Sequence, residues 1–303
     1  MKKLQYQFFL LFLAGILLLF PKYSVEGARN GLLLWSGTIV PTLLPFLLLT
    51  GLMNKYQTLH YISWIFFPIY HKIPTLNKNL AYTLVLGFFC GYPLGGKIIN
   101  DLVLSGSYTK KEGQCLLAVC NNVSPMFTIG YTITLILHSK ISVPLFLFCL
   151  YAPNICYFFL TFILFSKQGF LHTHHSDHTI SAQKTIDKIM FDSLLSIFTI
   201  GIYIMIFSIG ANLLTAFHPL PVISDFAIGC LEITTGITHF GALALNSSQK
   251  TAALCAISSF GGLCSIAQTG SVCRKSGLSM VSYTITKAFF ACISGLLAFF
   301  LFF

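Results

Sequence analysis

Long apolar runs follow one another along this chain, and short stretches containing glycine, proline or asparagine interrupt several of them. Charged residues make up 9% of the 303 residues, whereas roughly 25% is usual in a soluble domain. So few charges cannot cover a water-exposed surface, so the pattern predicts an all-α, polytopic membrane protein in contact with lipid. The net charge of +10 comes mostly from lysines and arginines in short loops and at the ends of the runs, which indicates membrane topology and no nucleic-acid partner.

Ten cysteines are present, and most of them fall inside the apolar runs. The sequence contains no C-x-x-C pair, which argues against a structural zinc site or a thioredoxin-like redox site. We therefore expect the cysteines to be free thiols that behave as small hydrophobic residues.

The apolar runs divide a single membrane domain, residues 1–303, into two halves. Residues 1–26 are expected to form a first span, at 4–21, and a loop. The first half covers residues 27–166, a polar histidine-rich loop covers 167–188, and the second half covers 189–303. Long helical segments are predicted at 28–53, 141–166, 189–217 and 279–303. Residues 59–73 are rich in aromatic side chains and are expected to lie at the membrane interface.

The segment at 28–53 has two prolines near its middle, Pro41 and Pro45. Each proline removes a backbone donor and obstructs a helical hydrogen bond. A kinked or broken helix at mid-depth is therefore predicted.

Residues 91–98, GYPLGGKI, match three positions of the phosphate-binding motif G-x-x-x-x-G-K-[ST]. The match fails at Ile98, which has no hydroxyl to bind magnesium, and the flanking residues are apolar and typical of a membrane hairpin. We instead expect a break in the hairpin. Lys97 would then either extend to the interface or face a cavity inside the membrane. The predicted break residues here are Gly91, Pro93, Gly95 and Gly96.

Further interruptions occur at Asn121–Pro125 and at Ser259–Gly262, with Pro125, Gly261 and Gly262 as break residues. Residues 95–130 and 235–270 also share a layout at an offset of 140 residues: an apolar arm, a polar turn, a short helix and a break. Interrupted helices at corresponding places in two halves are typical of secondary transporters. The fold is therefore predicted to contain two pseudo-repeated halves with re-entrant or broken helices.

Unwound backbone within a bilayer is tolerated where it is buried in protein or lines a cavity, and helix N-termini at such breaks favour anions. We therefore expect a mid-membrane site for a small polar or anionic solute. Helix capping and contacts between helices remain the alternative for these polar side chains. The candidate binding residues are Lys97, Asn121, Asn122, Ser124, Ser265, Gln268 and Thr269.

Glu232 is the acidic residue deep in the second half, and His239 follows two helical turns later if the stretch is helical. Such a pair suits ion or proton coupling, although a structural ion pair or an interfacial carboxylate would also explain it. The histidines at 172–178 are crowded in a polar loop and are expected to be solvated, without a metal. No catalytic motif is present, so we expect neither enzyme activity nor a cofactor.

Several of these segments also resemble a known family. GARNGLLLWSGTIVPTLLPFLLLTGLM is similar to the opening helix of Gate, or nucleoside-recognition, domains. GYPLGGKIINDL followed by CNNVSPMFTIG resembles the family of the sporulation integral membrane protein YlbJ, and SFGGLCSIAQTG resembles that family's second half. The resemblance covers most of residues 27–275.

This resemblance implies a membrane protein of endospore formation that moves dipicolinic acid across the outer forespore membrane. A nucleoside or an ion would be another solute for the same fold. A scaffold that assembles spore-membrane proteins without transporting anything is the alternative from a different class. Homo-oligomers or other spore-membrane proteins are further possible partners.

Overall fold

The computed structural model describes residues 14–56, 58, 83, 84, 87, 88, 91–165, 185–217 and 220–303, together with residues 7 and 11. Every regular element in these ranges is helical, in agreement with the predicted all-α class. The interfacial segment at 59–73, most of the histidine-rich loop and much of the predicted first span lie outside the described residues.

The first described elements form one bent unit. Helix α2 (Pro21–Leu34) continues through the π-helical η1 (Trp35–Ile39) into α3 (Val40–Lys55). The segments Pro21–Ile39 and Leu43–Met53 meet at an angle of 52°, which confirms the predicted kink beside Pro41 and Pro45. The predicted start at residue 28 is wrong, because the helix begins at Pro21, where a proline suits the first helical position.

Helix α2 packs closely against α11 (Ile186–Phe217) through Gly27 and Gly31. A Cβ atom added at these glycines would lie 2.7 Å from the Ile209 Cα and 2.9 Å from the Met205 Cα, respectively. The spacing of four residues places both glycines on one helix face, as in small-residue contacts between membrane helices. The Trp35 indole N–H then donates to the Ile197 carbonyl at 2.8 Å and extends this contact.

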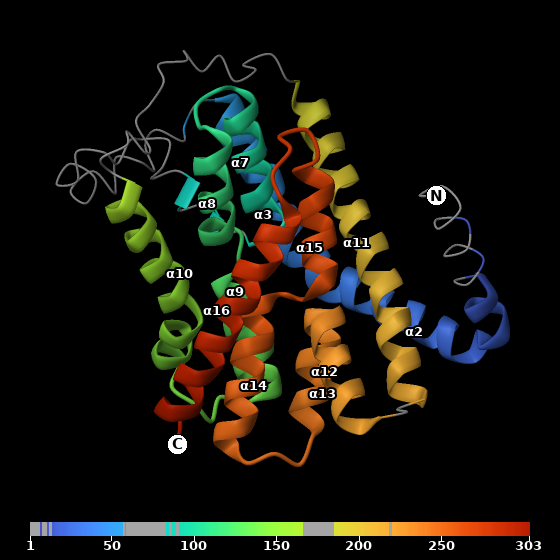
Figure 1. Ribbon diagram of the computed structural model, residues 1–303. Coiled ribbons are helices and arrows are strands. Elements are labelled where there is room, and N and C mark those ends of the chain that lie inside the picture. The colour runs from blue at the N-terminus through green and yellow to red at the C-terminus, as the bar shows by residue number, and fades with distance from the viewer. Residues whose placement is uncertain are drawn as a thin grey trace.

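The remaining elements form two groups. The first comprises α7 (Leu94–Leu104), α8 (Lys110–Cys120), α9 (Pro125–Phe127), the π-helical η2 (Thr128–Ile136) and α10 (Val143–Phe165). The second comprises α12 (Pro221–Leu231), α13 (Ile233–Ala242), α14 (Ser247–Phe260), α15 (Gly262–Val272) and α16 (Met280–Leu301). Figure 1 shows the α7–α8 and α13–α14 turns at opposite ends of the molecule. The pseudo-repeat stays a prediction.

A capping box fixes the start of the second helix in each of these two hairpins. Thr109 caps α8 and exchanges hydrogen bonds with Glu112, and Asn246 caps α14 and exchanges them with Gln249. These reciprocal contacts satisfy backbone N–H groups that a helix N-terminus leaves unpaired.

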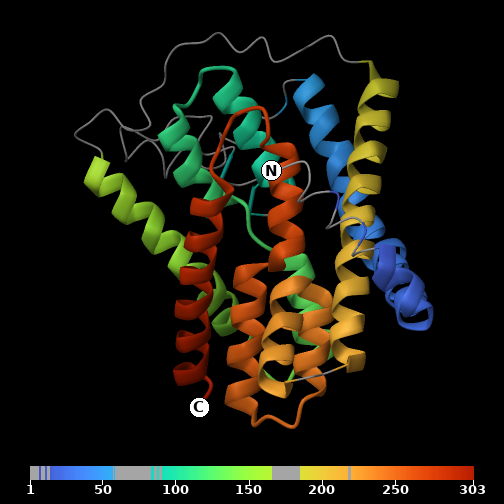
Figure 2. The same cartoon turned by 45° about the vertical axis from the view of Figure 1, so that its right-hand side comes forward.

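The helices lie in two layers, and the two views agree on their arrangement (Figures 1 and 2). The arm layer consists of α2, η1, α3 and α11, and the core layer contains the other elements. One apolar core joins α7, α8, α15 and α16, a second joins η2, α10, α13 and α14, and a third joins α11 to α15 beneath α3.

Large apolar side chains on the outer faces of α10, α11 and α16 are exposed, as expected for contact with lipid. Among the described residues, four helical stretches are long and apolar enough to cross a membrane, and the bent α2–η1–α3 unit would make five.

The Gly31 contact gives a first prediction. In Gly31→Ala, the new methyl group would press on the α11 backbone, which cannot move as a flexible side chain would. We expect a loss of about 1–3 kcal/mol in the free energy of unfolding, measured by thermal unfolding of the purified protein in detergent. Gly37→Ala is the matched control, because no atom of the described residues outside its own helix lies within 4 Å of its added Cβ. Equal stability of the two variants would contradict the close α2–α11 contact.

Candidate functional site

The interruptions at 91–93 and 121–124 lie against each other. The Tyr92 N–H donates to the Asn122 carbonyl at 2.9 Å. Gly91 has a φ of +74°, and a Cβ added there would lie 3.1 Å from the Ser124 nitrogen. A positive φ and this close approach both favour glycine. The first half therefore folds its two breaks into one unwound region.

The breaks of the second half meet the same region. Gly261, between α14 and α15, has a φ of +81°, and its added Cβ would lie 3.0 Å from the Tyr92 ring. Glu232 is extended and separates α12 from α13. A Cβ added at Gly262 would lie 3.2 Å from the Ile233 nitrogen. The interruptions of both halves thus meet around Tyr92, although they are far apart in the sequence.

Asn121 joins the two halves by hydrogen bonds that use its whole side chain. Its amide nitrogen donates to the Thr269 hydroxyl at 2.8 Å and to the Tyr283 hydroxyl at 2.9 Å. Its amide oxygen accepts from the Gly96 N–H at 3.1 Å, and the Tyr283 hydroxyl donates to the Asn121 carbonyl at 3.0 Å. Helices α7, α15 and α16 are therefore held at the end of α8 by one amide.

Asn122 is bound to a lysine that the sequence reasoning missed. Lys287 on α16 is 1% exposed, and its amino group donates to the Asn122 amide oxygen. The Asn122 amide nitrogen in turn donates to the Val119 carbonyl at the end of α8. A buried amine needs such a partner, because its transfer from water to an apolar interior is unfavourable. Lys287 thereby fixes the unwound segment after α8.

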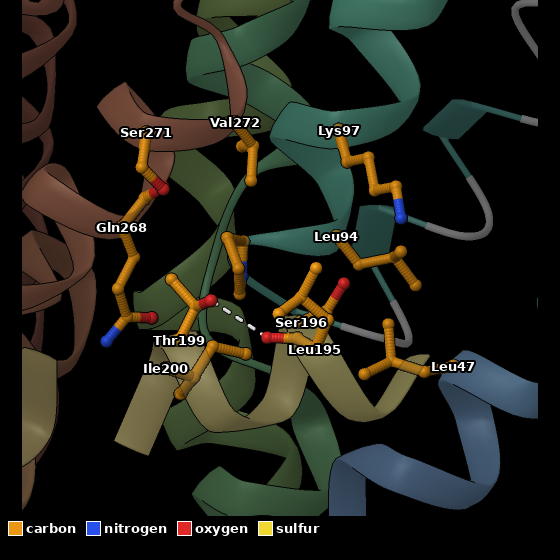
Figure 3. Close-up of a pocket in the computed structure, with 11 residues that line it drawn as sticks. Leu47, Leu94, Lys97, Leu195, Ser196, Thr199, Ile200, Gln268, Ser271 and Val272 are labelled. Atoms are coloured by element: carbon orange, nitrogen blue, oxygen red, sulfur yellow. Dashed lines mark hydrogen bonds between the residues drawn. The ribbon is translucent and has the colours of Figure 1, made fainter. Parts of the chain in front are cut away.

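A cavity of about 310 Å³ separates the arm layer from the core layer; we call it the interlayer cavity. Figure 3 shows Lys97 of α7 and Gln268 of α15 at opposite edges of this cavity. Helix α11 contributes two hydroxyls, Ser196 and Thr199, which donate to carbonyls of their own helix. The other lining residues are Leu47, Pro93, Leu94, Leu195, Ile200, Ser271 and Val272.

Two smaller cavities continue from this one towards the meeting point of the breaks. The first, of about 40 Å³, is lined by Tyr92, Glu232, Gly261, Ser265 and Gln268 and by apolar side chains; we call it the inner cavity. Gln268 and Ile200 line both the interlayer and the inner cavity. The second, of about 50 Å³, is lined by Gly91, Tyr92, Ser124 and apolar neighbours. The three cavities therefore follow one another between the layers and share lining residues.

Several helix N-termini point their backbone N–H groups into this region. Helices α7, α13 and α15 begin at the breaks, at Leu94, Ile233 and Gly262. Each N-terminus is equivalent to roughly half a positive charge. Asn121 and Glu232 satisfy part of the first turns of α7 and α13, whereas α15 has no side-chain cap. The α7 N-terminus, with Lys97 on its first turn, borders the interlayer cavity and suits an anion.

The predicted binding residues divide into two groups. Lys97, Ser124, Ser265 and Gln268 line the three cavities. The other three are buried and hydrogen-bonded to protein groups, and they do not line these cavities. Their contact with a solute stays a prediction, and in this conformation they hold the breaks together. They are Asn121, Asn122 and Thr269.

The predicted break residues are placed as follows. Gly91 and Pro93 precede α7, and Gly95 and Gly96 lie in its first turn instead of in the break. A Cβ added at Gly95 would lie 2.6 Å from the Cys120 carbonyl oxygen, so this glycine serves close packing. The remaining break residues agree with the prediction: Pro125 opens α9, Gly261 separates α14 from α15, and Gly262 opens α15.

Glu232 lies between α12 and α13 and is the N-cap of α13, the helix that carries His239 about two turns later. The Glu232 carboxylate accepts from the N–H groups of Thr234 and Thr235 at 3.1 and 2.7 Å. His239 instead pairs with Asp225 of α12, at 2.6 Å between Nε2 and Oδ1. The stretch between them is therefore helical, as the sequence argument assumed, while the coupling role of these residues stays a prediction. No Lys97–Asp101 ion pair is present among the described residues, where Asp101 accepts from the Asn100 amide.

The described cysteines are free thiols, as expected, and most of them are buried. Cys273, just beyond the end of α15, donates to the Gly96 carbonyl at 3.4 Å. Burial, and then the charge of Asp101, raises the pKa of the Cys273 thiol to about 12. This thiol is therefore protonated at neutral pH and contributes to packing between α7 and α15.

Sequence reasoning missed Tyr92, Tyr283 and Lys287. Lys287 had a clear signal, because it is a lone lysine in the last apolar span, and an ionisable residue there indicates function by default. The tyrosines had no such signal, since Tyr283 contacts Asn121, which is 162 positions away, and the Tyr92 ring meets Gly261 of the other half. Helix α11 also carried no sign that Ser196 and Thr199 would face a cavity.

Comparisons with known proteins give one informative match. The chain is a distant homologue of the sporulation integral membrane protein YlbJ of Bacillus subtilis strain 168, with 23% identity over 245 residues, or 74% of this chain. The aligned part spans 60% of that relative's length. No family model and no solved structure matches. Together with its membrane-length helices, this homology identifies the chain as a multi-pass integral membrane protein.

The Lys287–Asn122 contact gives a second prediction. Asn122→Leu would leave the buried amine without its partner and should lower the free energy of unfolding by roughly 3–5 kcal/mol. Adding Lys287→Met removes the unpaired amine. The double variant should therefore lose about 1–3 kcal/mol less free energy of unfolding than the sum of the losses in the two single variants. Detergent-solubilised protein unfolded by heat provides the measurement.

Lys111→Met is the control for this cycle, because Lys111 is exposed at the start of α8. Its effect should stay within about 0.5 kcal/mol. Strictly additive losses in the Asn122 and Lys287 variants would show that the two side chains do not interact in the folded protein.

Proposed function

We propose that this chain transports a small anionic solute across a bacterial membrane during endospore formation. Dipicolinate is the favoured solute, and the outer forespore membrane is the favoured location. The observation that carries the proposal is the interlayer cavity, where Lys97 is the one formal charge among the 11 lining residues. A cationic side chain beside a helix N-terminus suits a carboxylate ligand.

The size of the cavity supports a small solute. Its volume of about 310 Å³ lies at the lower end of small-molecule pockets, which span about 300–1,000 Å³. Dipicolinate is a flat aromatic dianion, so its ring could contact the apolar walls formed by Leu47, Leu94 and Ile200. Its carboxylates could accept hydrogen bonds from Lys97 and Gln268.

The arrangement of the breaks supports alternating exposure of this site. Both halves place a hairpin, a capped helix, an interruption and a further helix in the same order, and their turns lie at opposite ends (Figure 1). Inverted repeats of this kind allow one half to move against the other around a fixed site. In this proposal the core layer moves against the arm layer, and the cavity between them opens to alternate sides.

The distribution of basic residues supports one orientation of the protein in the membrane. Lys110 and Lys111 begin α8, Lys188 lies near the start of α11, and Arg274 and Lys275 follow α15. Figures 1 and 2 show these three element ends on the same side of the molecule. An excess of lysine and arginine marks the cytoplasmic side. The interlayer cavity, lined by the last turn of α15, would then face the cytoplasm of the mother cell.

The sporulation role is supported by the name of the distant relative, which is described as a sporulation integral membrane protein. Transport itself is supported by the cavity and the breaks. A scaffold would need the buried polar groups at the breaks only for stability. It would not require the interlayer cavity.

The third prediction tests the proposed function directly. Purified protein in liposomes should take up radiolabelled dipicolinate well above the level of protein-free liposomes. Lys97→Gln should lower uptake at subsaturating solute roughly tenfold or more, because a charge-assisted hydrogen bond contributes about 1.5–3 kcal/mol. Lys111→Gln removes an exposed lysine outside the cavity and should leave uptake unchanged.

Unlabelled nucleosides and inorganic anions, added in excess, would identify the preferred solute by competition. Uptake no greater than in protein-free liposomes, with all these solutes, would favour the scaffold alternative. Uptake that is identical in Lys97→Gln and in the unmodified protein would exclude Lys97 from the binding site.

A further inference from the structure

The inner cavity contains a buried carboxylate with no basic partner among the described residues. Glu232 is 2% exposed, and its carboxylate accepts hydrogen bonds from the backbone N–H and hydroxyl groups of Thr234 and Thr235 in the first turn of α13. The nearby ion pair between His239 and Asp225 does not include Glu232. Helix N-termini compensate part of this negative charge, but a buried charge without a counter-ion remains unfavourable.

A second polar group in the same cavity has no hydrogen-bond partner among the described residues. The Tyr92 hydroxyl oxygen is buried and makes no hydrogen bond with any described residue. Tyr92 and Glu232 both line the inner cavity, together with Ser265 and Gln268. Buried polar groups are hydrogen-bonded in the great majority of cases. Two observations, a buried carboxylate without a cationic partner and a buried hydroxyl without a hydrogen bond among the described residues, therefore point to a ligand in the same space.

The chemistry of the lining selects a small cation. The available ligands are carboxylate, hydroxyl and amide oxygens, which suit hard cations. A single carboxylate favours a monovalent over a divalent ion, because divalent sites usually combine several charged ligands. The volume of about 40 Å³ accommodates an ion or a few waters and excludes an organic solute.

The backbone around the inner cavity supports the same choice. Helix α12 ends at Leu231 and α14 ends at Phe260, so the carbonyl ends of two helices reach this region. The Leu231 carbonyl oxygen lies 3.1 Å from the position of an added Cβ at Gly262. Carbonyls at interrupted helices and the negative ends of half-helices bind sodium in membrane carriers of several folds.

We propose that the inner cavity binds Na⁺ through Glu232 and Tyr92, and that this ion is coupled to the solute in the interlayer cavity. Gln268 lines both cavities, so a cation bound on one side of Gln268 lies next to an anion bound on the other. The attraction between the two ions lowers the free energy needed to transfer either charge from water into a low-dielectric site. The coupling rests on the proposed transport of an anion, whereas the binding of Na⁺ does not.

The test measures cation binding without any solute or membrane gradient. Purified protein in detergent is unfolded by heat in increasing NaCl, with N-methylglucamine chloride added to keep the ionic strength constant. A ligand that binds the folded state raises the midpoint of unfolding as its concentration rises. We expect a saturable rise in Tm with Na⁺ for the unmodified chain.

Two variants locate the site, each with a matched control. Tyr92→Phe removes the unpartnered hydroxyl and should raise the Na⁺ concentration for half-maximal effect at least tenfold, while Tyr131→Phe, whose hydroxyl contacts Thr238 at 2.9 Å, should not. Glu232→Gln should abolish the rise, while Glu112→Gln, which alters the capping carboxylate of α8, should retain it. If Glu232→Gln does not fold, Tyr92→Phe alone decides.

A Tm that is the same in Na⁺ and N-methylglucamine would overturn the proposal, as would a rise that Tyr92→Phe leaves unchanged. In liposomes, the coupling predicts that an inward Na⁺ gradient increases dipicolinate uptake and that Tyr92→Phe reduces this increase. A Na⁺-dependent Tm without dipicolinate uptake would support the cation site and reject the proposed solute, so the two failures are distinguishable.

Discussion

Unwound backbone inside a bilayer has to find hydrogen-bond partners within the protein, and in this chain one asparagine meets much of that need. Asn121 ends α8, accepts from the first turn of α7 and donates to both α15 and α16. Because these helices come from both halves of the sequence, the same amide that satisfies the first break also fixes its distance from the second. The cavities between the two layers exist because this junction keeps the broken helices in place.

The same junction explains why some polar residues of the breaks are hydrogen-bonded to protein groups whereas others line the cavities. The amides that face the interior of the core layer, Asn121 and Asn122, are saturated by protein groups. Those that face the arm layer, such as Gln268, border open space. The structural roles and the proposed binding roles therefore lie on opposite sides of one unwound region, and a movement of the arm layer could change the cavities without breaking the junction.

Local sequence signals predicted the interruptions well, because proline and glycine act on the backbone where they stand. The bend beside Pro41 and the end of α8 at Asn121 were predicted for this reason. The break at Glu232 was missed, since neither glycine nor proline marks it and the carboxylate itself caps α13. The meeting of Tyr92 with Gly261 could not be predicted either, because it depends on how two distant breaks pack.

The central claim is that the solute binds in the cavity that the broken helices form against α11. Ser271 lines this cavity and is exposed, so the most direct measurement uses Ser271→Cys in a chain whose native cysteines are replaced. A charged thiol reagent should modify this position, and saturating dipicolinate should slow the reaction there but not at Ser105→Cys in the α7–α8 turn. Equal reaction rates at Ser271→Cys with and without dipicolinate would contradict the account.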